Sequence, residues 1–243
     1  MKIALLGYGK MGMEIERTAL ERGHEIMLKV NSKTKIQLQE LEKADVAIDF
    51  STPQAVVNNI IACFAVNLPV VVGTTGWDSN LNEISEQCRK RKQAMFHSSN
   101  FSIGATIFFE LNKKLASLMD SEAGYEVSIE ERHHHHKLDK PSGTAIRLAD
   151  GIISNLKRKS SWTTNHPEKT GQAEAGNTSV LISSVREGDV PGTHLISYDS
   201  EIDTVEIKHT AKNRRGFALG AVRAAEYIIG KKGVFTMTDI LNF

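Results

Sequence analysis

The stretch Lys2–Ile15, KIALLGYGKMGMEI, decides the fold of the first third of the chain. Its apolar start, Lys2–Leu6, predicts a short buried strand, and one apolar stripe along Lys10–Arg22 predicts a helix. Between them, three glycines have the G-x-G-x-x-G spacing of a dinucleotide-binding loop: Gly7 for the tight turn, Gly9 for close approach to a pyrophosphate, Gly12 for helix–strand packing. The following helix N-terminus would offer free N–H groups and partial positive charge to the phosphates. The alternative is that the glycines serve only for turning.

Strands and helices continue to alternate as far as residue 97. Further strands are expected at Glu25–Val30, Val46–Phe50, Val70–Val72 and Ala94–His97, with helices at Pro53–Val66 and Asn80–Lys92. Alternation at this spacing is typical of a parallel sheet with helices on both faces. The sequence therefore predicts an α/β fold with a Rossmann-type domain at the start of the chain.

The pattern changes after Phe101. Helices are expected at Ile103–Met119 and Thr144–Leu156, a strand at Tyr125–Glu131, and a polar loop at Lys157–Asn177. Alternating apolar positions in Val180–Arg186, Thr193–Tyr198 and Thr204–His209 predict an antiparallel sheet with one covered face. A last helix, Ala218–Ile229, precedes a short tail. We expect the Rossmann-type domain to comprise residues 1–102 and 216–243, with an α+β domain, residues 103–215, inserted between them.

The composition excludes several classes of protein. The chain has 243 residues, 40% hydrophobic and 24% charged, with a formal net charge of +1, so neither nucleic acid nor a membrane surface is an expected partner. No apolar stretch approaches the roughly 20 residues needed to span a bilayer. Cys63 and Cys88 have no disulfide or zinc spacing, which favours reduced thiols and a cytoplasmic location.

The end of the second predicted strand bears on cofactor choice. An NAD-specific site usually places an acidic residue there to bind the ribose hydroxyls. The segment Leu28–Lys35 is LKVNSKTK, with Asn31, Ser32 and Lys33 and no carboxylate. Lys33, and also Lys35, could instead contact a 2′-phosphate. We expect NADPH to bind at least as well as NADH.

Three polar loops follow successive predicted strands: Asp49–Pro53 (DFSTP), Gly73–Asp78 (GTTGWD) and Ser98–Gly104 (SSNFSIG). In an open parallel sheet, ligands bind beyond the carboxyl ends of the strands. Small hydroxyl and amide side chains there suit an uncharged nicotinamide and its ribose. Each loop alone could equally be a structural turn; together they favour a cofactor cleft.

The segment Ser128–Ile146, SIEERHHHHKLDKPSGTAI, carries the most unusual chemistry of the chain. A metal site is disfavoured, because strand alternation would put His133 and His135 on one face and His134 and His136 on the other, with no cysteine nearby. No metal is therefore expected. A solvated basic patch does not account for the Pro-Ser-Gly-Thr turn that follows. Histidine can donate a proton near neutral pH, and Thr144, at a helix start, can present free amides to a carboxylate.

Six motifs now carry a resemblance to a known family. In chain order they are GYGKMG, GTTGWD, SSNFSIGA, EERHHHHKLDKPSGTAI, VREGDVPGTH and RRGFALGAVRAA. The chain resembles the 4-hydroxy-tetrahydrodipicolinate reductases of lysine biosynthesis, also called dihydrodipicolinate reductases, over nearly its whole length. The resemblance implies a hydride transfer from NADPH or NADH to a small cyclic dicarboxylate, a middle domain that holds the substrate, and a homotetramer.

Matching the motifs residue by residue implies the site. The family's proton donor and acceptor falls on His133 and its second donor on Lys137, while substrate contacts fall on His134, Gly143 and Thr144. Cofactor contacts fall on Gly7, Tyr8, Gly9, Lys10, Met11, Gly12, Gly73, Thr74, Thr75, Ser99, Asn100, Phe101 and Ser102. The chain departs from the pattern at His135, where arginine is common, and at Ser98 and Ser99, where alanine is common.

Other residues remain open at this stage. The segment Arg186–His194, REGDVPGTH, is interpreted as a strand connection with a role in architecture and subunit contact, His97 as a neighbour of the cofactor cleft, and His136 as structural. Arg214 could reach a substrate carboxylate or be a surface residue. Two other functions are weighed: a different dehydrogenase of amino-acid metabolism, and a catalytically silent NADPH-binding regulator. Neither would need the histidine–lysine–PSGT block.

Overall fold

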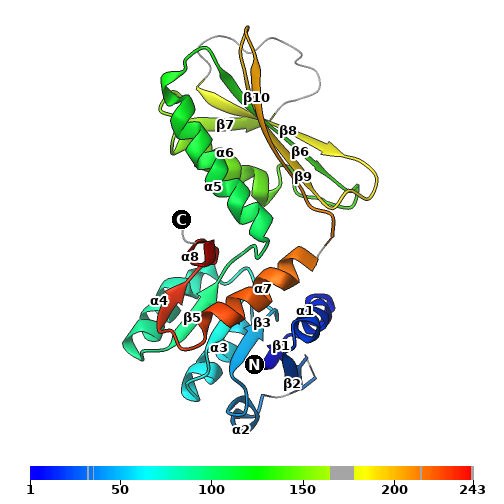
Figure 1. Ribbon diagram of the computed structural model, residues 1–243, viewed down its shortest axis with the longest axis vertical. Coiled ribbons are helices and arrows are strands. Elements are labelled where there is room, and N and C mark those ends of the chain that lie inside the picture. Colours follow the sequence, from blue (N-terminus) through cyan, green and yellow to red (C-terminus); the bar gives the residue numbers. More distant parts are fainter. Residues whose placement is uncertain (32, 35, 165–177, 214, 242–243) are drawn as a thin grey trace. The chain divides into compact units, whose positions relative to one another are not determined.

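The computed structural model describes residues 1–31, 33–34, 36–164, 178–213 and 215–241. The chain forms two compact units, one from Met1–Thr106 and Arg214–Phe243 and the other from Ile107–Asn213. Both ends of the chain thus build the first unit, and the second is inserted between them (Figure 1).

The first unit contains a six-stranded parallel sheet, which confirms the predicted α/β Rossmann-type fold. Its strand order is β11-β5-β4-β3-β1-β2. The strands are β1 (Lys2–Leu6), β2 (Glu25–Val30), β3 (Val46–Asp49), β4 (Val70–Val72), β5 (Ala94–His97) and β11 (Gly233–Phe235). The order reverses between β1 and β3, so ligands are expected beyond the ends of these two strands. Strand β11 lies in what the sequence indicated only as a tail.

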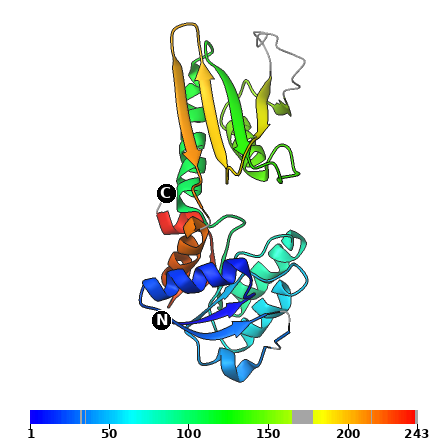
Figure 2. The same cartoon turned by 90° about the vertical axis from the view of Figure 1, so that its right-hand side faces the viewer.

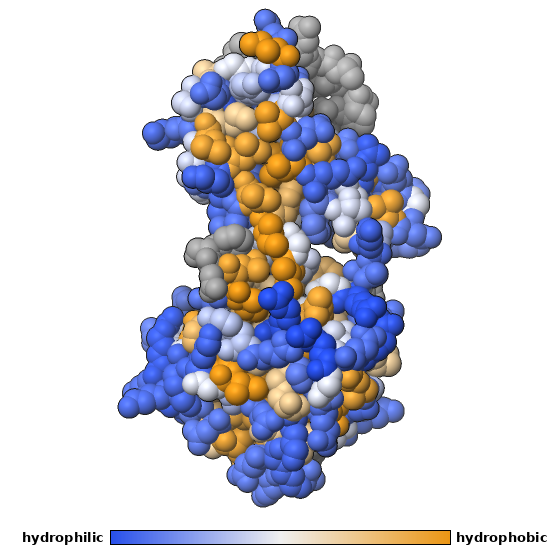
Figure 3. All heavy atoms as spheres, viewed as in Figure 1, coloured by the Kyte–Doolittle hydropathy of each residue, from blue (hydrophilic) through white to orange (hydrophobic). Residues whose placement is uncertain are grey.

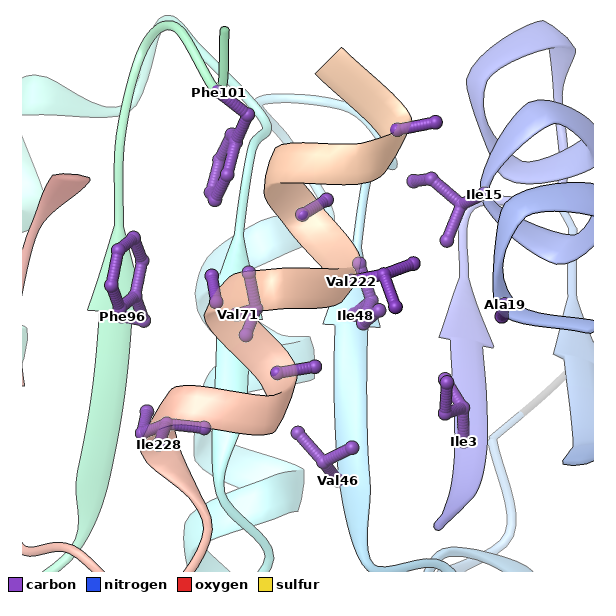
Figure 4. Packing of buried hydrophobic residues seen from close by; sticks show 14 of the residues in the cluster. Ile3, Ile15, Ala19, Val46, Ile48, Val71, Phe96, Phe101, Val222 and Ile228 are labelled. Atoms are coloured by element: carbon purple, nitrogen blue, oxygen red, sulfur yellow. The ribbon is translucent and has the colours of Figure 1, made fainter. Parts of the chain in front are cut away.

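Helices cover both faces of this sheet (Figure 2). They are α1 (Lys10–Glu21), α2 (Leu38–Leu41), α3 (Val56–Ala65), α4 (Asp78–Lys90), α7 (Arg215–Ile228) and α8 (Met237–Leu241). Alternate strand residues such as Ile3 and Ile48 pack against α1 and α7 (Figure 4), and their neighbours pack against α3 and α4. Because both faces are buried, the strands are almost continuously apolar, as parallel sheets require.

The second unit contains a five-stranded sheet in the order β10-β9-β6-β8-β7. Its strands are β6 (Glu126–His133), β7 (Ser161–Thr164), β8 (Ser179–Arg186), β9 (Thr193–Asp199) and β10 (Thr204–Thr210). Helices α5 (Ile103–Leu118, which starts in the first unit) and α6 (Gly143–Ile153) flank the sheet, with a 3₁₀ turn at Met119–Ser121 after α5. The Asn112 side chain joins the two helices through a 2.9 Å hydrogen bond to the Leu148 carbonyl.

Two predictions for this sheet were wrong in part. It is mixed rather than antiparallel, because β8 runs parallel to both β6 and β7. The chain reaches β8 from β6 through α6, and a helical crossover is what parallel pairing needs. The expected loop Lys157–Asn177 also contains β7, a short edge strand whose single large apolar residue, Trp162, gave no alternation to detect. Residues 165–177 of that loop lie outside the described residues.

Candidate active site

The glycine loop after β1 has the geometry that a nucleotide phosphate needs. Gly7 has φ +98°, and a Cβ there would lie 2.2 Å from the Phe50 carbonyl oxygen; a Cβ on Gly12 would lie 2.6 Å from the Gly7 oxygen. Nothing lies within 4 Å of a Cβ built on Gly9, so a ligand can approach the backbone there. The first backbone bond of α1 runs from Met13 N–H to Gly9 O, 3.0 Å, which leaves the preceding amides of the helix free for an anion.

A pocket of about 750 Å³ opens beside this loop. It lies where the ends of β1, β2 and β3 meet, at the reversal of strand order. The lining residues are Gly7, Tyr8, Gly9, Val30, Asn31, Thr34, Ile36, Leu38, Phe50, Ser51, Thr52, Ala55, Asn58, Asn59 and Ala62. Its volume and mixed apolar and amide lining suit a nucleotide.

The end of β2 offers no carboxylate to this pocket among the described residues. Asn31 Oδ1 accepts hydrogen bonds from the Lys33 backbone N–H at 2.9 Å and the Thr34 hydroxyl at 3.1 Å, which shapes a polar turn. Lys33 is exposed. Ser32 and Lys35, also considered from the sequence, lie outside the described residues.

Two of the three polar strand-end loops, Asp49–Pro53 and Gly73–Asp78, are tied together by a buried carboxylate that the sequence did not single out. Asp49, at the end of β3, accepts hydrogen bonds from Thr74 Oγ1 at 2.6 Å, Asn59 Nδ2 at 2.6 Å and Ser51 Oγ at 2.8 Å. Burial raises the pKa of Asp49, and these hydrogen bonds oppose the rise. The Thr74 hydroxyl is therefore committed to fixing the loops.

The remaining predicted cofactor residues lie in different surroundings. Thr75 and Ser99 line a smaller pocket of about 80 Å³ together with His97, whose pKa burial lowers. Phe101 is buried, with its ring packed on Phe50 and Phe96, so only its backbone can face a ligand. Asn100 Oδ1 accepts from the Ser102 N–H at 2.8 Å, and a Cβ on Gly73 would strike the Phe50 ring at 2.1 Å. Lys10 is exposed, and Met11 is half-buried against the core beside α1.

In the second unit, only the first residue of the histidine run lies in a strand. Strand β6 ends at His133, and His134–His136 form a turn, so the alternation of faces expected for the run does not apply beyond it. His133 is 7% exposed, whereas His135 and His136 are exposed. His134 is half-buried, and its Nδ1 atom has no hydrogen-bond partner in the described part of the chain.

His133 belongs to a buried charged cluster. Its Nδ1 atom hydrogen-bonds to Glu131, which is fully buried, and Arg186 Nη2 donates to the other oxygen of Glu131 at 2.8 Å. Burial alone would raise the pKa of Glu131, but the hydrogen bonds from His133 and Arg186 outweigh it and lower that pKa to about 2. Glu131 is therefore a carboxylate at any physiological pH.

His194, on β9, packs edge-on against His133, with ring centroids 5.1 Å apart. Burial, and then the neighbouring His133, lower the pKa of His194 to about 4, so this imidazole is neutral near pH 7. Its Nε2 lies 3.2 Å from the Ser142 hydroxyl, and Ser142 caps α6 by accepting the Ala145 N–H at 3.2 Å. One imidazole thus links His133 to the start of α6.

The other predicted substrate residues lie on the same segment of chain. Lys137 is half-buried, and its Nζ pairs with both oxygens of Asp139 at 2.8 Å. Helix α6 begins at Gly143, one residue before its predicted start. Its first backbone hydrogen bond runs from the Ile146 N–H to the Ser142 carbonyl, so the amides of Gly143 and Thr144 come before it. These amides remain available to an anion. Arg214 lies outside the described residues.

A metal ion is a poor fit to this cluster. One donor atom each from Glu131, His133 and His194 lie within 4.8 Å of one another. However, the Arg186 guanidinium already neutralises the carboxylate, and the His133 nitrogen nearest to it is already hydrogen-bonded. A cation would have to displace both contacts.

Three residues of this cluster were missed from the sequence. Glu131 was assigned only to a strand, and Arg186 and His194 to the ends of an architectural connection. The sequence did contain a signal for Glu131, because side chains two residues apart in a strand point to the same face. If β6 runs to His133, Glu131 must lie on the same face of the sheet as His133. Arg186 and His194 needed the strand pairing, because their partners lie 55 and 52 residues away in the chain.

Comparison with known proteins agrees with this geometry over the whole chain. The family profile described as dihydrodipicolinate reductase, N-terminus, matches residues 1–101, and the one described as dihydrodipicolinate reductase, C-terminus, matches residues 104–241. The chain belongs to the dihydrodipicolinate reductase family. The members of this family are pyridine-nucleotide-dependent oxidoreductases.

Individual relatives support the same assignment. A 4-hydroxy-tetrahydrodipicolinate reductase from Christiangramia forsetii is 47% identical over 242 residues, covering 100% of this chain and 98% of the relative. Its counterpart from Staphylococcus carnosus is 35% identical, with both chains fully covered. Among solved structures, a dipicolinate-bound dihydrodipicolinate reductase from Paenisporosarcina sp. TG-14 matches with a TM-score of 0.77 and 26% identity, covering 98% of each chain.

No helix in the described ranges is long and apolar enough to cross a membrane.

Proposed function

We propose that this protein reduces 4-hydroxy-tetrahydrodipicolinate to tetrahydrodipicolinate, in the diaminopimelate route of lysine biosynthesis. The hydroxyl at ring carbon 4 leaves as water together with a proton from the adjacent carbon, which creates a double bond between the two carbons. Carbon 4 then accepts the hydride that a reduced nicotinamide supplies when bound, and one proton is added back at the adjacent carbon, so each turnover consumes one hydride and one proton. Membership of the family and the names of its relatives support this assignment.

The observation that carries the mechanism is the state of His133. Its Nδ1 is held by a buried carboxylate, while its Nε2 makes no hydrogen bond within the described part of the chain. In the proposed mechanism His133 delivers the proton, with Lys137, four residues further along the chain, as a second donor. A positioned general acid of this kind contributes about 10²–10⁴-fold in rate.

The substrate carries two carboxylates, and the second unit offers groups for them. We assign the amides of Gly143 and Thr144 to one carboxylate, since they have no partner among the described residues at the start of α6. His134, whose Nδ1 is buried without a partner in the described chain, is assigned to a further substrate contact. In this scheme residues 103–215 form the substrate domain.

Residues 1–102 and 216–243 form the cofactor domain in the same scheme. The pocket beside Gly7–Gly12 takes the adenosine and pyrophosphate, and the loops at Gly73–Thr75 and Ser99–Ser102 take the nicotinamide side. We propose that NADPH binds at least as well as NADH, because Lys33 is exposed beside Asn31 and the sequence has no carboxylate between Leu28 and Lys35 to oppose a 2′-phosphate.

We further propose a homotetramer in the cytoplasm. A tetramer with two-fold symmetries needs two separate self-complementary surfaces. The second unit offers two: the sheet face opposite His133, with half-buried Leu181, Val185 and Leu195, and an apolar strip on α5 formed by Ile107, Leu111 and Leu118 (Figure 3). The two buried, free cysteines fit a reducing compartment.

The test couples the purified protein to a synthase that makes the substrate in situ and follows oxidation of NADPH and NADH. Turnover with at least one nicotinamide is expected, and none with either rejects the reductase. His133→Gln should lower kcat by about 10²-fold or more, because this is the rate enhancement that a general acid contributes. The affinity for NADPH should be unchanged. Loss of NADPH affinity with kcat preserved would remove His133 from the proton transfer.

A further inference from the structure

The carboxylate of Glu131 fixes where the His133 proton sits. An ionised carboxylate can only accept hydrogen bonds, so the Nδ1 atom that contacts it must carry the hydrogen. This leaves Nε2 as the atom through which the ring gains and loses a proton. On that side, a Cβ built on Gly192 would lie 3.0 Å from Nε2, so this glycine keeps the space beside the reactive nitrogen open.

Arg186 holds two parts of the site at once. Its Nη2 donates to Glu131 at 2.8 Å and to the Asp139 carbonyl at 2.7 Å, and its Nε donates to the Lys137 carbonyl at 3.3 Å. The side chain is only 7% exposed. A single rigid guanidinium therefore connects the carboxylate behind His133 to the backbone of the loop that carries Lys137, a geometry that the ammonium of a lysine cannot reproduce.

The charges around His133 are consistent with this arrangement. They come from Glu131 on β6, Arg186 on β8, Lys137 in the following loop, and the imidazole of His194 on β9, with His209 of β10 next to it. His194 is neutral near pH 7, so it does not oppose protonation of His133. Glu131 is the one carboxylate in contact with the ring within the described chain.

We propose that Glu131 and Arg186 are positioning residues for the reaction: together they hold the His133 proton on Nδ1, present Nε2 to the substrate, and set Lys137 beside it. The inference rests on the function proposed above, in which His133 and Lys137 supply the protons. Neither Glu131 nor Arg186 needs to touch the substrate for this role.

The test compares Glu131→Gln and Arg186→Lys, which keep size or charge, with matched substitutions elsewhere. The first unit holds the same three residue types: Arg22 donates to Glu226 at 2.8 and 2.9 Å, and His24 contacts Glu226 at 2.8 Å. Glu226→Gln and Arg22→Lys are therefore the controls, and both should keep wild-type kinetics. Circular dichroism and thermal melting show which variants are folded.

For Glu131→Gln we expect kcat to fall at least about 10-fold, which is part of the 10²–10⁴-fold rate enhancement that a general acid contributes, with KM for NADPH unchanged. The alkaline limb of the kcat profile should move to lower pH, because the carboxylate that stabilises the imidazolium is gone. Arg186→Lys should also raise KM for the dicarboxylate, since the Lys137 loop loses two backbone contacts. A folded Glu131→Gln variant with wild-type kcat and pH profile would overturn the inference.

A spectroscopic readout separates this inference from the proposed function. Two-bond ¹H–¹⁵N correlation spectra of histidine-labelled protein report which ring nitrogen carries the hydrogen. His133 should be in the Nδ1–H form in the wild type and in a mixture of forms in Glu131→Gln. If the wild type fails to turn over, the proposed function fails while this spectrum still tests the positioning. An Nε2–H form in the wild type overturns the positioning even in an active enzyme.

Discussion

The described part of the protein contains two Arg–Glu–His clusters built from the same three side chains but in different surroundings. In the second unit, the side chains of Arg186, Glu131 and His133 are 7%, 0% and 9% exposed. In the first unit, those of Arg22, Glu226 and His24, which join α1 and its following turn to α7, are 40%, 29% and 14% exposed. The two clusters differ in burial and not in residue types, so a comparison of their variants isolates the effect of burial.

At the surface cluster, water competes for every contact and dissolved ions screen the charges. Hydrogen bonds lower the pKa of Glu226 against a raising effect of partial burial, yet the carboxylate keeps access to solvent if one partner moves away. Glu131 has no such alternative, because a lone buried carboxylate would lose its solvation. Its two partners are therefore held in one arrangement, which suits a group that must orient a proton donor.

The largest expected effect comes from leaving the buried cluster incomplete. Removing one partner of a buried ion pair typically costs about 3–5 kcal/mol, because the remaining charge is stranded, whereas an exposed pair is worth about 0–1 kcal/mol. We expect Glu131→Ala to lower the free energy of unfolding by the first amount, since it strands Arg186, and Glu226→Ala by the second. Urea denaturation at pH 7 measures both; equal losses would show that burial is not the deciding difference.

A second prediction concerns acid. Burial lowers the pKa of His194, beside the buried cluster, from 6.5 to about 4. Between these values the unfolded chain binds a proton that the folded chain does not, so stability falls as pH drops from about 6.5 to 4, by about 3 kcal/mol. His194→Asn should remove this part of the pH dependence. Urea denaturation at several pH values gives the slope of the free energy of unfolding against pH. Because burial also lowers the pKa of His97 and His209, the slope of the variant must be subtracted from that of the wild type.

An unchanged slope in His194→Asn would mean that His194 titrates normally, and that burial around the cluster does not exclude charge. Glu131 cannot produce the same signal. Its pKa is lowered to about 2, so the stability it adds is complete above pH 4.5 and is lost only as pH falls from there towards 2. The two groups therefore titrate in largely separate ranges.

The first unit could be predicted from sequence because its signals are local. Short apolar strands alternate with amphipathic helices, and the glycine spacing falls between a strand and a helix, so each element is indicated by its own residues. Strand β11 was missed because its three residues, Gly233–Phe235, are too few to show a period. Its place at the edge of the sheet depends on pairing with β5, which is not local information.

The buried cluster could be predicted only in part, for the same reason. His133 was indicated by its unusual run, but its partners are set by strand register: His133 lies opposite Arg186 on β8, and Glu131 lies opposite His194 on β9. The sequence suggested only antiparallel pairing, so the parallel neighbour β8, and with it Arg186, could not be placed. The surface cluster shares this limit, since Arg22 and Glu226 are 204 residues apart.

The smallest expected effect concerns salt and sharpens the contrast between the two clusters. At 1 M salt the Debye length in water is about 3 Å, so dissolved ions screen exposed charges strongly. Buried charges are screened much less. The stability difference between wild type and Glu226→Gln should be under about 1 kcal/mol at 50 mM NaCl and should nearly vanish at 1 M. The difference for Glu131→Gln should stay constant over the same range, because Arg186 and His133 are shielded from ions by the protein. Urea denaturation at the two salt concentrations measures both stability differences. A strong salt dependence for Glu131→Gln would mean that ions reach the buried cluster, and that burial does not distinguish it from the surface cluster.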